Sequence, residues 1–187
     1  MSPILVRPVR EQLEHDRVIR LLQTRFRRRY EVGINPGQEQ NAAVGSGATA
    51  NYPDVVLLAS DRGRRLQGVI EVETAESVNN LEAMAQWARL AKLRAPFHLY
   101  VPASAVDVAR RLCSDHQIAV AEVVSYHSIG DQLRFTTVYR APAEPRRATV
   151  RTTAPRRLDA PRPKTATHVR SAKRAAARKP ARPSRRK

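Results

Sequence analysis

Two strand-like runs near the middle of the chain decide the fold: Tyr-Pro-Asp-Val-Val-Leu-Leu-Ala at residues 52–59 and Gln-Gly-Val-Ile-Glu-Val-Glu-Thr at residues 67–74. The stretch between them, Ser-Asp-Arg-Gly-Arg-Arg at residues 60–65, has the composition of a hairpin loop, which predicts that the two strands pair antiparallel. The first run shows no alternation of apolar and polar residues after its Pro-Asp start. We therefore expect it to be buried on both faces.

Three carboxylates lie among these otherwise apolar residues. The period of two along a strand places Glu71 and Glu73 on one face of the second strand, with Ile70 and Val72 on the other. In an antiparallel pair, Asp54 lies beside Glu71, with the Val72 carbonyl between them. Such hard oxygen ligands suit Mg²⁺ or Mn²⁺. Two readings follow: a metal site at Asp54, Glu71 and Val72, or acids that merely end a loop and face solvent.

The same residues form a recognisable pattern. Pro53-Asp54, sixteen further residues and then Glu71-Val72-Glu73 resemble the core motif of the PD-(D/E)xK nuclease superfamily, with Glu73 where the family usually has Lys. Some active restriction endonucleases share that variant. The resemblance implies Mg²⁺- or Mn²⁺-dependent hydrolysis of phosphodiester bonds, with Asp54, Glu71 and Glu73 as catalytic residues. A third acid often comes from the first helix in this family, and Glu14 is the candidate here.

The order of predicted elements agrees with that resemblance. Apolar spacing and turn residues predict a helix over 11–27, a strand over 30–34, the two acid-bearing strands, a helix over 77–93, a strand over 97–101, a helix over 103–115, and strands over 118–126 and 132–139. This is the αβββαβ core arrangement of the superfamily, with a helix and two strands appended. The expected fold class is α/β, an αβββαβ restriction-endonuclease-like core with a mixed sheet.

Each of the first two helices has a predicted apolar face. Asn79, with Glu82 three residues later, forms a possible capping box for the second helix. The predicted buried faces are Leu13, Val18, Ile19, Leu22 and Phe26 on the first helix, and Leu81, Met84, Ala85, Ala88 and Ala91 on the second.

Composition divides the chain near residue 141. Residues 141–187 hold +14 of the formal net charge of +17, seven of the thirteen prolines and no aromatic residue. A segment of this kind cannot bury enough apolar surface to offset roughly 1–2 kcal/mol of backbone ordering entropy per residue. The expected organisation is one folded domain over 1–140 and a disordered tail rich in Lys, Arg, Pro and Ala over 141–187.

The end of the tail is similar to the basic tails of linker histones and bacterial histone-like proteins. Its cations would neutralise phosphates without reading sequence. A solubility tail, or one that binds ribosomal RNA or an anionic membrane, is the alternative, but residues 170–179 lack the bulky apolar face of a membrane helix. The predicted nucleic-acid-binding residues are Arg25, Arg27, Arg28 and Arg29 at the end of the first helix, and Lys173, Arg174, Arg178, Lys179, Arg182, Arg185, Arg186 and Lys187 in the tail.

Other features narrow the class of protein. The chain has neither a signal-peptide-like start nor an apolar run of about eighteen residues, so we expect a cytoplasmic, nucleoid-associated protein without membrane contact. Cys113 is the single cysteine and fits a helix core better than a nucleophile. The five histidines have no metal-ligand spacing and are expected to be structural or exposed. The polar segment 35–51 is expected to be a mobile loop, either closing over a nucleic acid or without a role.

Three hypotheses from different classes follow. The first is a metal-dependent DNA endonuclease or nuclease-like enzyme that the basic tail tethers to DNA. The second is a catalytically inactive DNA-binding or nucleoid-associated protein of the same fold. The third is an interaction module that binds another protein, with a tail that only localises it. A homodimer through an exposed edge strand at residues 132–139 is compatible with each of them.

Overall fold

The computed structural model of the 187-residue chain describes residues 8–37, 39–130 and 132–142. All but the first two residues of the predicted tail, and with them its eight predicted nucleic-acid-binding residues, lie outside these ranges. The elements follow one another as α1 (Val9–Phe26), β1 (Tyr30–Ile34), the 3₁₀ turn η1 (Gly47–Thr49), β2 (Val55–Ala59), β3 (Leu66–Val72), α2 (Asn80–Glu82), the π-helical turn η2 (Ala83–Trp87), α3 (Ala88–Leu90), β4 (Phe97–Pro102), the 3₁₀ turn η3 (Ala103–Ala105), α4 (Val106–Asp115), β5 (Glu122–Ile129) and β6 (Gln132–Arg140).

The strands form one six-stranded mixed sheet in the order β1-β2-β3-β4-β5-β6. β2 pairs antiparallel with β1 and β3, the neighbours β3, β4 and β5 run parallel, and β6 returns antiparallel to β5. The α/β class and the mixed sheet are therefore confirmed. Within the described part of the chain β6 is an edge strand, as predicted.

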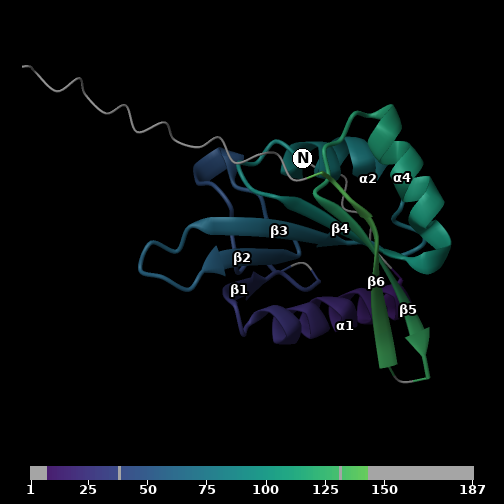
Figure 1. The fold of residues 1–187 in the computed structure, drawn as a ribbon, viewed down its shortest axis with the longest axis horizontal. Coiled ribbons are helices and arrows are strands. Elements are labelled where there is room, and N and C mark those ends of the chain that lie inside the picture. Colours follow the sequence, from purple (N-terminus) through teal and green to yellow (C-terminus); the bar gives the residue numbers. More distant parts are fainter. Residues whose placement is uncertain (1–7, 38, 131, 143–187) are drawn as a thin grey trace, which may run out of the picture. The chain divides into compact units, whose positions relative to one another are not determined.

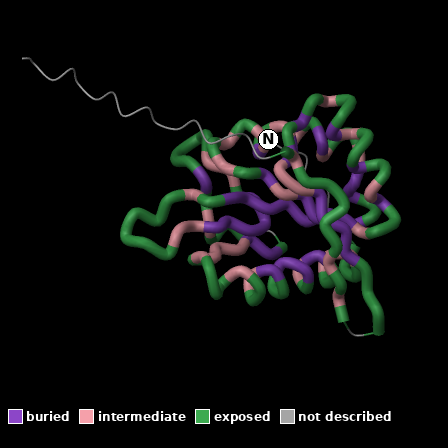
Figure 2. Tube along the Cα trace, viewed as in Figure 1, coloured by how far each residue is buried: buried purple, intermediate pink, exposed green. Residues whose placement is uncertain are grey.

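Helices cover both faces of the sheet (Figure 1). α1 packs on one face through Val18, Ile19 and Leu22, which share a core cluster with Ile70 and Val72 of β3. The segment α2-η2-α3 and α4 pack on the other face, in a second cluster. Figure 2 shows the buried residues concentrated in the central strands, with an exposed end on the β5–β6 hairpin.

The predicted hairpin of β2 and β3 is confirmed. Val55 pairs with Ile70, and Val56 pairs with Val69. Val55, Val56 and Leu57 are buried, so β2 contributes to both core clusters. β2 begins only at Val55, because the chain bends at Asp54 and the preceding Pro53 has no N–H for a strand ladder.

The predicted apolar faces of the two helices are only partly correct. Leu13, Leu81 and Met84 are exposed to 66%, 48% and 58%. The helical segment 80–90 instead buries Ala83, Trp87 and Leu90. Asn79 does begin this segment, because its side-chain oxygen accepts the N–H of Glu82 at 3.0 Å. The π turn then changes the helical phase, which a regular 3.6-residue pattern cannot anticipate.

The segment predicted as a mobile loop is tied to its surroundings. The side chain of Asn35 donates to the carbonyls of Ala42 and Pro53 at 2.8 and 2.7 Å and accepts the N–H of Ala42 at 2.7 Å. Val44 and Asn51 form an isolated antiparallel bridge. Asn35 is 3% exposed. These bonds hold the chain ahead of β2 against the sheet.

No helix in the ranges that the structure describes has both the length and the apolarity to cross a membrane. Cys113 lies in α4 and belongs to the core cluster on that face, as predicted. Burial raises the pKa of its thiol from 9.0 to about 11.

We predict that Cys113 reacts slowly in the folded protein. At pH 8 a two-unit rise in pKa lowers the thiolate fraction about a hundredfold. Reaction with a thiol reagent should therefore be slow in buffer and fast in denaturant. The raised pKa also makes the free energy of unfolding fall as pH rises from 9.0 towards 11, and Cys113→Ala should lack this fall. Fast labelling in buffer at pH 8 would contradict the burial of this thiol.

Candidate functional site

A cleft of about 1170 Å³ opens beside the carboxyl end of β3. It lies between three segments that are distant in the sequence. The N-terminal half of α1 forms one wall, the chain around residues 35–54 the second, and the segment 76–90 the third. Clefts outside the carboxyl ends of strands are the usual ligand sites of open α/β sheets.

The charged side chains that line the cleft are mostly acidic. They include six carboxylates, against one arginine, Arg89, and the imidazole of His15. Such a cleft repels phosphates and attracts cations. The six acids are Glu11, Glu39, Asp54, Glu71, Glu76 and Glu82.

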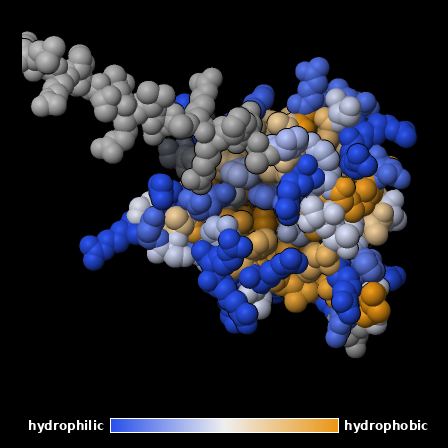
Figure 3. All heavy atoms as spheres, viewed as in Figure 1, coloured by the Kyte–Doolittle hydropathy of each residue, from blue (hydrophilic) through white to orange (hydrophobic). Residues whose placement is uncertain are grey.

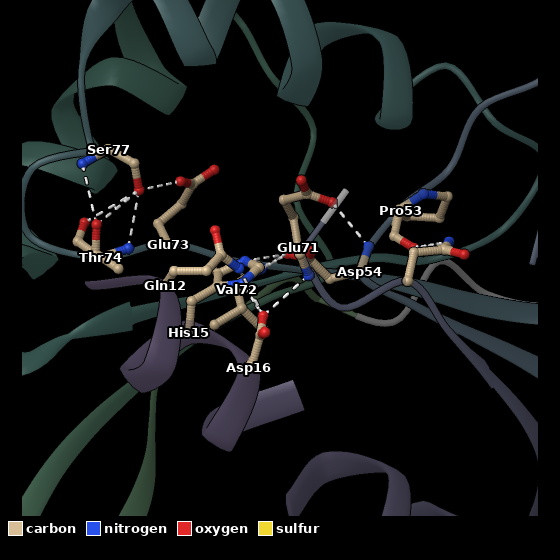
Figure 4. Close-up of polar contacts among 12 residues, drawn as sticks. Gln12, His15, Asp16, Pro53, Asp54, Glu71, Val72, Glu73, Thr74 and Ser77 are labelled. Carbon is tan, nitrogen blue, oxygen red and sulfur yellow. Dashed lines mark hydrogen bonds and ion pairs between the residues drawn. The ribbon is translucent and has the colours of Figure 1, made fainter. Parts of the chain in front are cut away.

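Two of the predicted site residues meet inside this cleft (Figure 4). Because Val55 pairs with Ile70, Asp54 just ahead of β2 comes to lie next to Glu71. The Asp54 N–H points to Glu71 Oε2 at 3.3 Å, and the side chains of both residues line the cleft. Asp54 is 7% exposed and Glu71 is 1% exposed. The predicted neighbourhood of these two carboxylates is therefore present.

Val72 also contacts Asp54. Its N–H donates to Asp54 Oδ2 at 2.8 Å, and its carbonyl as a metal ligand stays a prediction. The backbone amide holds the Asp54 carboxylate at the end of β3.

His15 is the functional candidate that the sequence analysis missed. Its Nε2 lies 3.1 Å from Asp54 Oδ2, and its Nδ1 lies 3.2 Å from Asp16 Oδ1. A neutral imidazole can donate to one of these carboxylates, whereas an imidazolium donates to both. His15 is 1% exposed. The available signal was its spacing of three, four and seven residues from Val18, Ile19 and Leu22, which puts it on the buried face of α1.

Glu73 lies on the same side of the strand as Glu71, as the period of two predicts (Figure 4). Its carboxylate nevertheless does not line the cleft. It has no exposed surface, accepts the indole N–H of Trp87 at 2.7 Å and accepts a short hydrogen bond from the Ser77 hydroxyl. The Glu73 carbonyl accepts the hydroxyl of Tyr126 at 2.7 Å. The structure thus brings Asp54 and Glu71 together and directs Glu73 into the packing behind them.

The donor set of the cleft fits a hard divalent cation. Mg²⁺ is held in proteins by one or two carboxylates and keeps several waters. Asp54 and Glu71 supply two carboxylates to the same cleft. Within residues 8–37, 39–130 and 132–142, no group of three or more His, Cys, Asp or Glu side chains is arranged to ligate a metal ion. A site here would therefore rest on two carboxylates and water.

Other predicted residues lie away from the cleft. Glu14 is exposed on α1 and does not line the cleft. Arg27 follows the end of α1, twelve residues from His15, which is about 18 Å along a helix axis. The arginines at residues 27–29 therefore do not face Asp54. Burial lowers the pKa of His98 on β4, with Glu122 at 3.3 Å partly opposing this, which agrees with a structural role.

We predict that Glu73→Gln destabilises the protein by about 1–3 kcal/mol. The glutamine amide has one oxygen acceptor where the carboxylate has two. The hydrogen bonds from the Trp87 indole and the Ser77 hydroxyl cannot both keep their strength, and one of these buried donors loses part of its hydrogen bond. Because Trp87 is the only tryptophan, its emission reports both the local change and unfolding in denaturant. Glu76→Gln, an exposed acid of the same segment, is the matched control and should change stability by less than about 0.5 kcal/mol. Equal stability of the two variants would contradict the role of Glu73.

We also predict that His15→Leu destabilises the protein by about 1–3 kcal/mol, because the buried Asp54 carboxylate loses a partner. Glu14→Leu, at the neighbouring exposed position, is the control. A double-mutant cycle with Asp54→Asn, measured by denaturant unfolding, isolates the pair. Strictly additive effects of His15→Leu and Asp54→Asn would show that the two side chains are not coupled.

Comparison with known proteins assigns no family to the chain. No family model, no curated protein and no solved structure matches it.

Proposed function

We propose that the protein is a divalent-metal-dependent nuclease that hydrolyses phosphodiester bonds in the acidic cleft. The observation that carries this proposal is that two buried acids, Asp54 and Glu71, line the same cleft, with the Asp54 N–H 3.3 Å from Glu71 Oε2. Carboxylates in that arrangement are suited to hold a cation beside a phosphate.

The architecture supports the proposal without any matching relative. With α2, η2 and α3 counted as one segment and the 3₁₀ turn η1 left out, the first six elements along the chain run helix, three strands, helical segment and strand. This is the αβββαβ order that the PD-(D/E)xK resemblance implies. In this chain Asp54 lies directly before the second strand and Glu71 lies on the third. We take the nuclease-like core to be the finer description of this α/β fold.

Each residue then has a distinct task. Asp54 and Glu71 would hold the metal ion, which supplies Lewis acidity and a bound water of lowered pKa. The Val72 N–H and His15 hold the Asp54 carboxylate in position. Glu73, predicted from the resemblance as a catalytic residue, is better placed as a positioning residue, because its carboxylate binds Trp87 and Ser77 and is screened from the cleft.

A specific observation favours the second candidate function, a catalytically inactive nucleic-acid-binding protein. The resembled motif has a Lys at the position of Glu73, and a Lys there would orient water and offset negative charge. In this chain the side chain at that position is a buried carboxylate with structural partners. DNA is the proposed partner under both candidates, and only the first requires hydrolysis.

We predict that the full-length protein cleaves nucleic acid with Mg²⁺ or Mn²⁺ and that Asp54→Asn lowers the rate about a hundredfold or more. The measurement is cleavage of labelled duplex, branched and single-stranded DNA and of RNA. Asp61→Asn, which removes an exposed acid from the β2–β3 loop, is the control and should cleave normally. EDTA should abolish cleavage by every variant.

Thermal unfolding supplies a readout that does not depend on turnover. Mg²⁺ or Mn²⁺ should raise the Tm of the wild type and of Asp61→Asn, because a ligand that binds only the folded state stabilises it. Asp54→Asn should show little of this rise. If the wild type neither cleaves any substrate nor gains stability from either metal, the nuclease proposal fails and the inactive binding protein replaces it.

A further inference from the structure

A second hollow lies along the other side of α1. It has a volume of about 860 Å³ and runs between α1 and the first residues of β6. Arg17, Arg20 and Arg25 line it from the helix, and Leu133 and Phe135 line it from the strand. We call this hollow the basic groove.

The basic groove has the opposite charge from the cleft. Its three arginines are exposed, and one carboxylate, Asp16, lines it with them. Asp16 accepts hydrogen bonds from the Gln12 side chain at 2.7 Å and from the Gly37 N–H at 3.0 Å. The guanidinium of Arg25 lies 5.6 Å from the ring centroid of Phe135. A cation–π contact at this distance holds a guanidinium with its edge available to an anion.

The groove and the acidic cleft adjoin each other. Leu13 lines both of them and is 66% exposed between them. Gln12 and His15 face the cleft, while Arg17 and Arg20, one turn further along α1, face the groove. The surface around α1 accordingly mixes hydrophilic and hydrophobic side chains (Figure 3).

The spacing of the arginines matches a phosphate backbone. Arg17 and Arg25 are eight residues apart on one helix, which is about 12 Å along its axis. One strand of duplex DNA carries a phosphate about every 3.4 Å along its axis, so this length spans about three or four phosphates. Arginine is also the side chain best suited to bind phosphate through paired N–H groups.

We infer that the basic groove binds the sugar-phosphate backbone of a nucleic-acid strand and leads that strand across Leu13 to the Asp54–Glu71 pair. The strand is then held by its phosphates on one side of α1 and presented to the cleft on the other. Binding of the sugar-phosphate backbone in the groove does not depend on the proposed function. Only the delivery of the strand to a cleaving site rests on it. A second copy of this chain fits the groove poorly, since it would bring like-charged arginines together.

The first experiment maps arginine reactivity in the full-length protein. The protein is treated with phenylglyoxal in EDTA, with and without a single-stranded or duplex oligonucleotide, and the modified positions are found by mass spectrometry. We expect severalfold protection of Arg17, Arg20 and Arg25. Arg110 and Arg111, which are exposed on α4 across the sheet, should react equally in both samples. Protection confined to residues beyond 142 would overturn the inference. So would protection of the groove arginines that increases with protein concentration when no DNA is present, because another copy of the protein would then cover the groove.

The second experiment measures the DNA affinity of two double variants at several salt concentrations. The groove variant carries Arg17→Gln and Arg20→Gln. The α4 variant carries Arg110→Gln and Arg111→Gln and so loses the same charge from the opposite face of the sheet. Each phosphate contact contributes about 0.9 to the slope of log affinity against log salt on duplex DNA. In the groove variant the magnitude of the slope should fall by up to about 1.8, and DNA should bind several times more weakly. The α4 variant should keep the slope and the affinity of the wild type. Equal slopes would overturn the inference. In the groove variant the Mg²⁺-dependent rise in Tm should persist.

The two proposals fail in different ways. If the groove arginines are protected but the wild type cuts nothing, the groove stands and the nuclease proposal falls. If the wild type cuts and the groove variant has unchanged salt slope, unchanged protection and an unchanged KM, the nuclease stands and the groove inference falls.

Discussion

The carboxylate of Glu73 has no exposed surface, and an ionised group in that position must receive its hydrogen bonds from the protein. Moving such a group out of water costs several kcal/mol unless donors replace the lost hydration. The donors come from the segment that follows β3: the hydroxyl of Ser77 and the indole of Trp87. Tyr126 of β5 adds a bond to the Glu73 carbonyl. The carboxylate of Glu73 therefore joins the end of β3 to residues 77–90, and its backbone carbonyl joins it to β5.

The neighbouring acids, Glu71 and Asp54, have partners from other parts of the fold. Glu71, two residues earlier on the same side of β3, is placed towards the cleft and meets the backbone of Asp54. Asp54 is held by the Val72 N–H from the sheet and by His15 from α1. The site thus depends on both helical layers: the segment 80–90 fixes the end of β3 on one face, and α1 supplies His15 from the other. Glu71 and Glu73 therefore have different surroundings: Glu71 meets the backbone of Asp54 at the cleft, whereas Glu73 binds Ser77 and Trp87.

The sequence predicts much of this arrangement and misses parts for physical reasons. The hairpin, the shared side of Glu71 and Glu73 and the meeting of Asp54 with Glu71 follow from strand periodicity and pairing, which are local properties. The partners of Glu73 do not, because Trp87 reaches it across a π turn that shifts the helical phase. His15 was given no role, since a histidine on an apolar helix face is ordinary until the opposing Asp54 is placed. The exposed Leu13 departs from the predicted face because the helix there borders two hollows rather than the core.

The separation of charge across α1 bears on the choice between the two candidate functions. A phosphate 4 Å from a carboxylate is repelled by about 1 kcal/mol in water and about 4 kcal/mol at the effective dielectric of a protein surface. With six carboxylates lining the cleft, a polyanion can occupy it only when cations accompany it. In a protein that merely holds nucleic acid, an acidic cleft beside a basic groove would weaken binding. In a protein that holds a metal ion at Asp54 and Glu71, the same carboxylates are the means of bringing the cation to the phosphate, and the arginines across the helix offset the repulsion of the strand. Opposite charges on the two sides of one helix therefore favour a site that acts on a phosphodiester over a surface that only binds one.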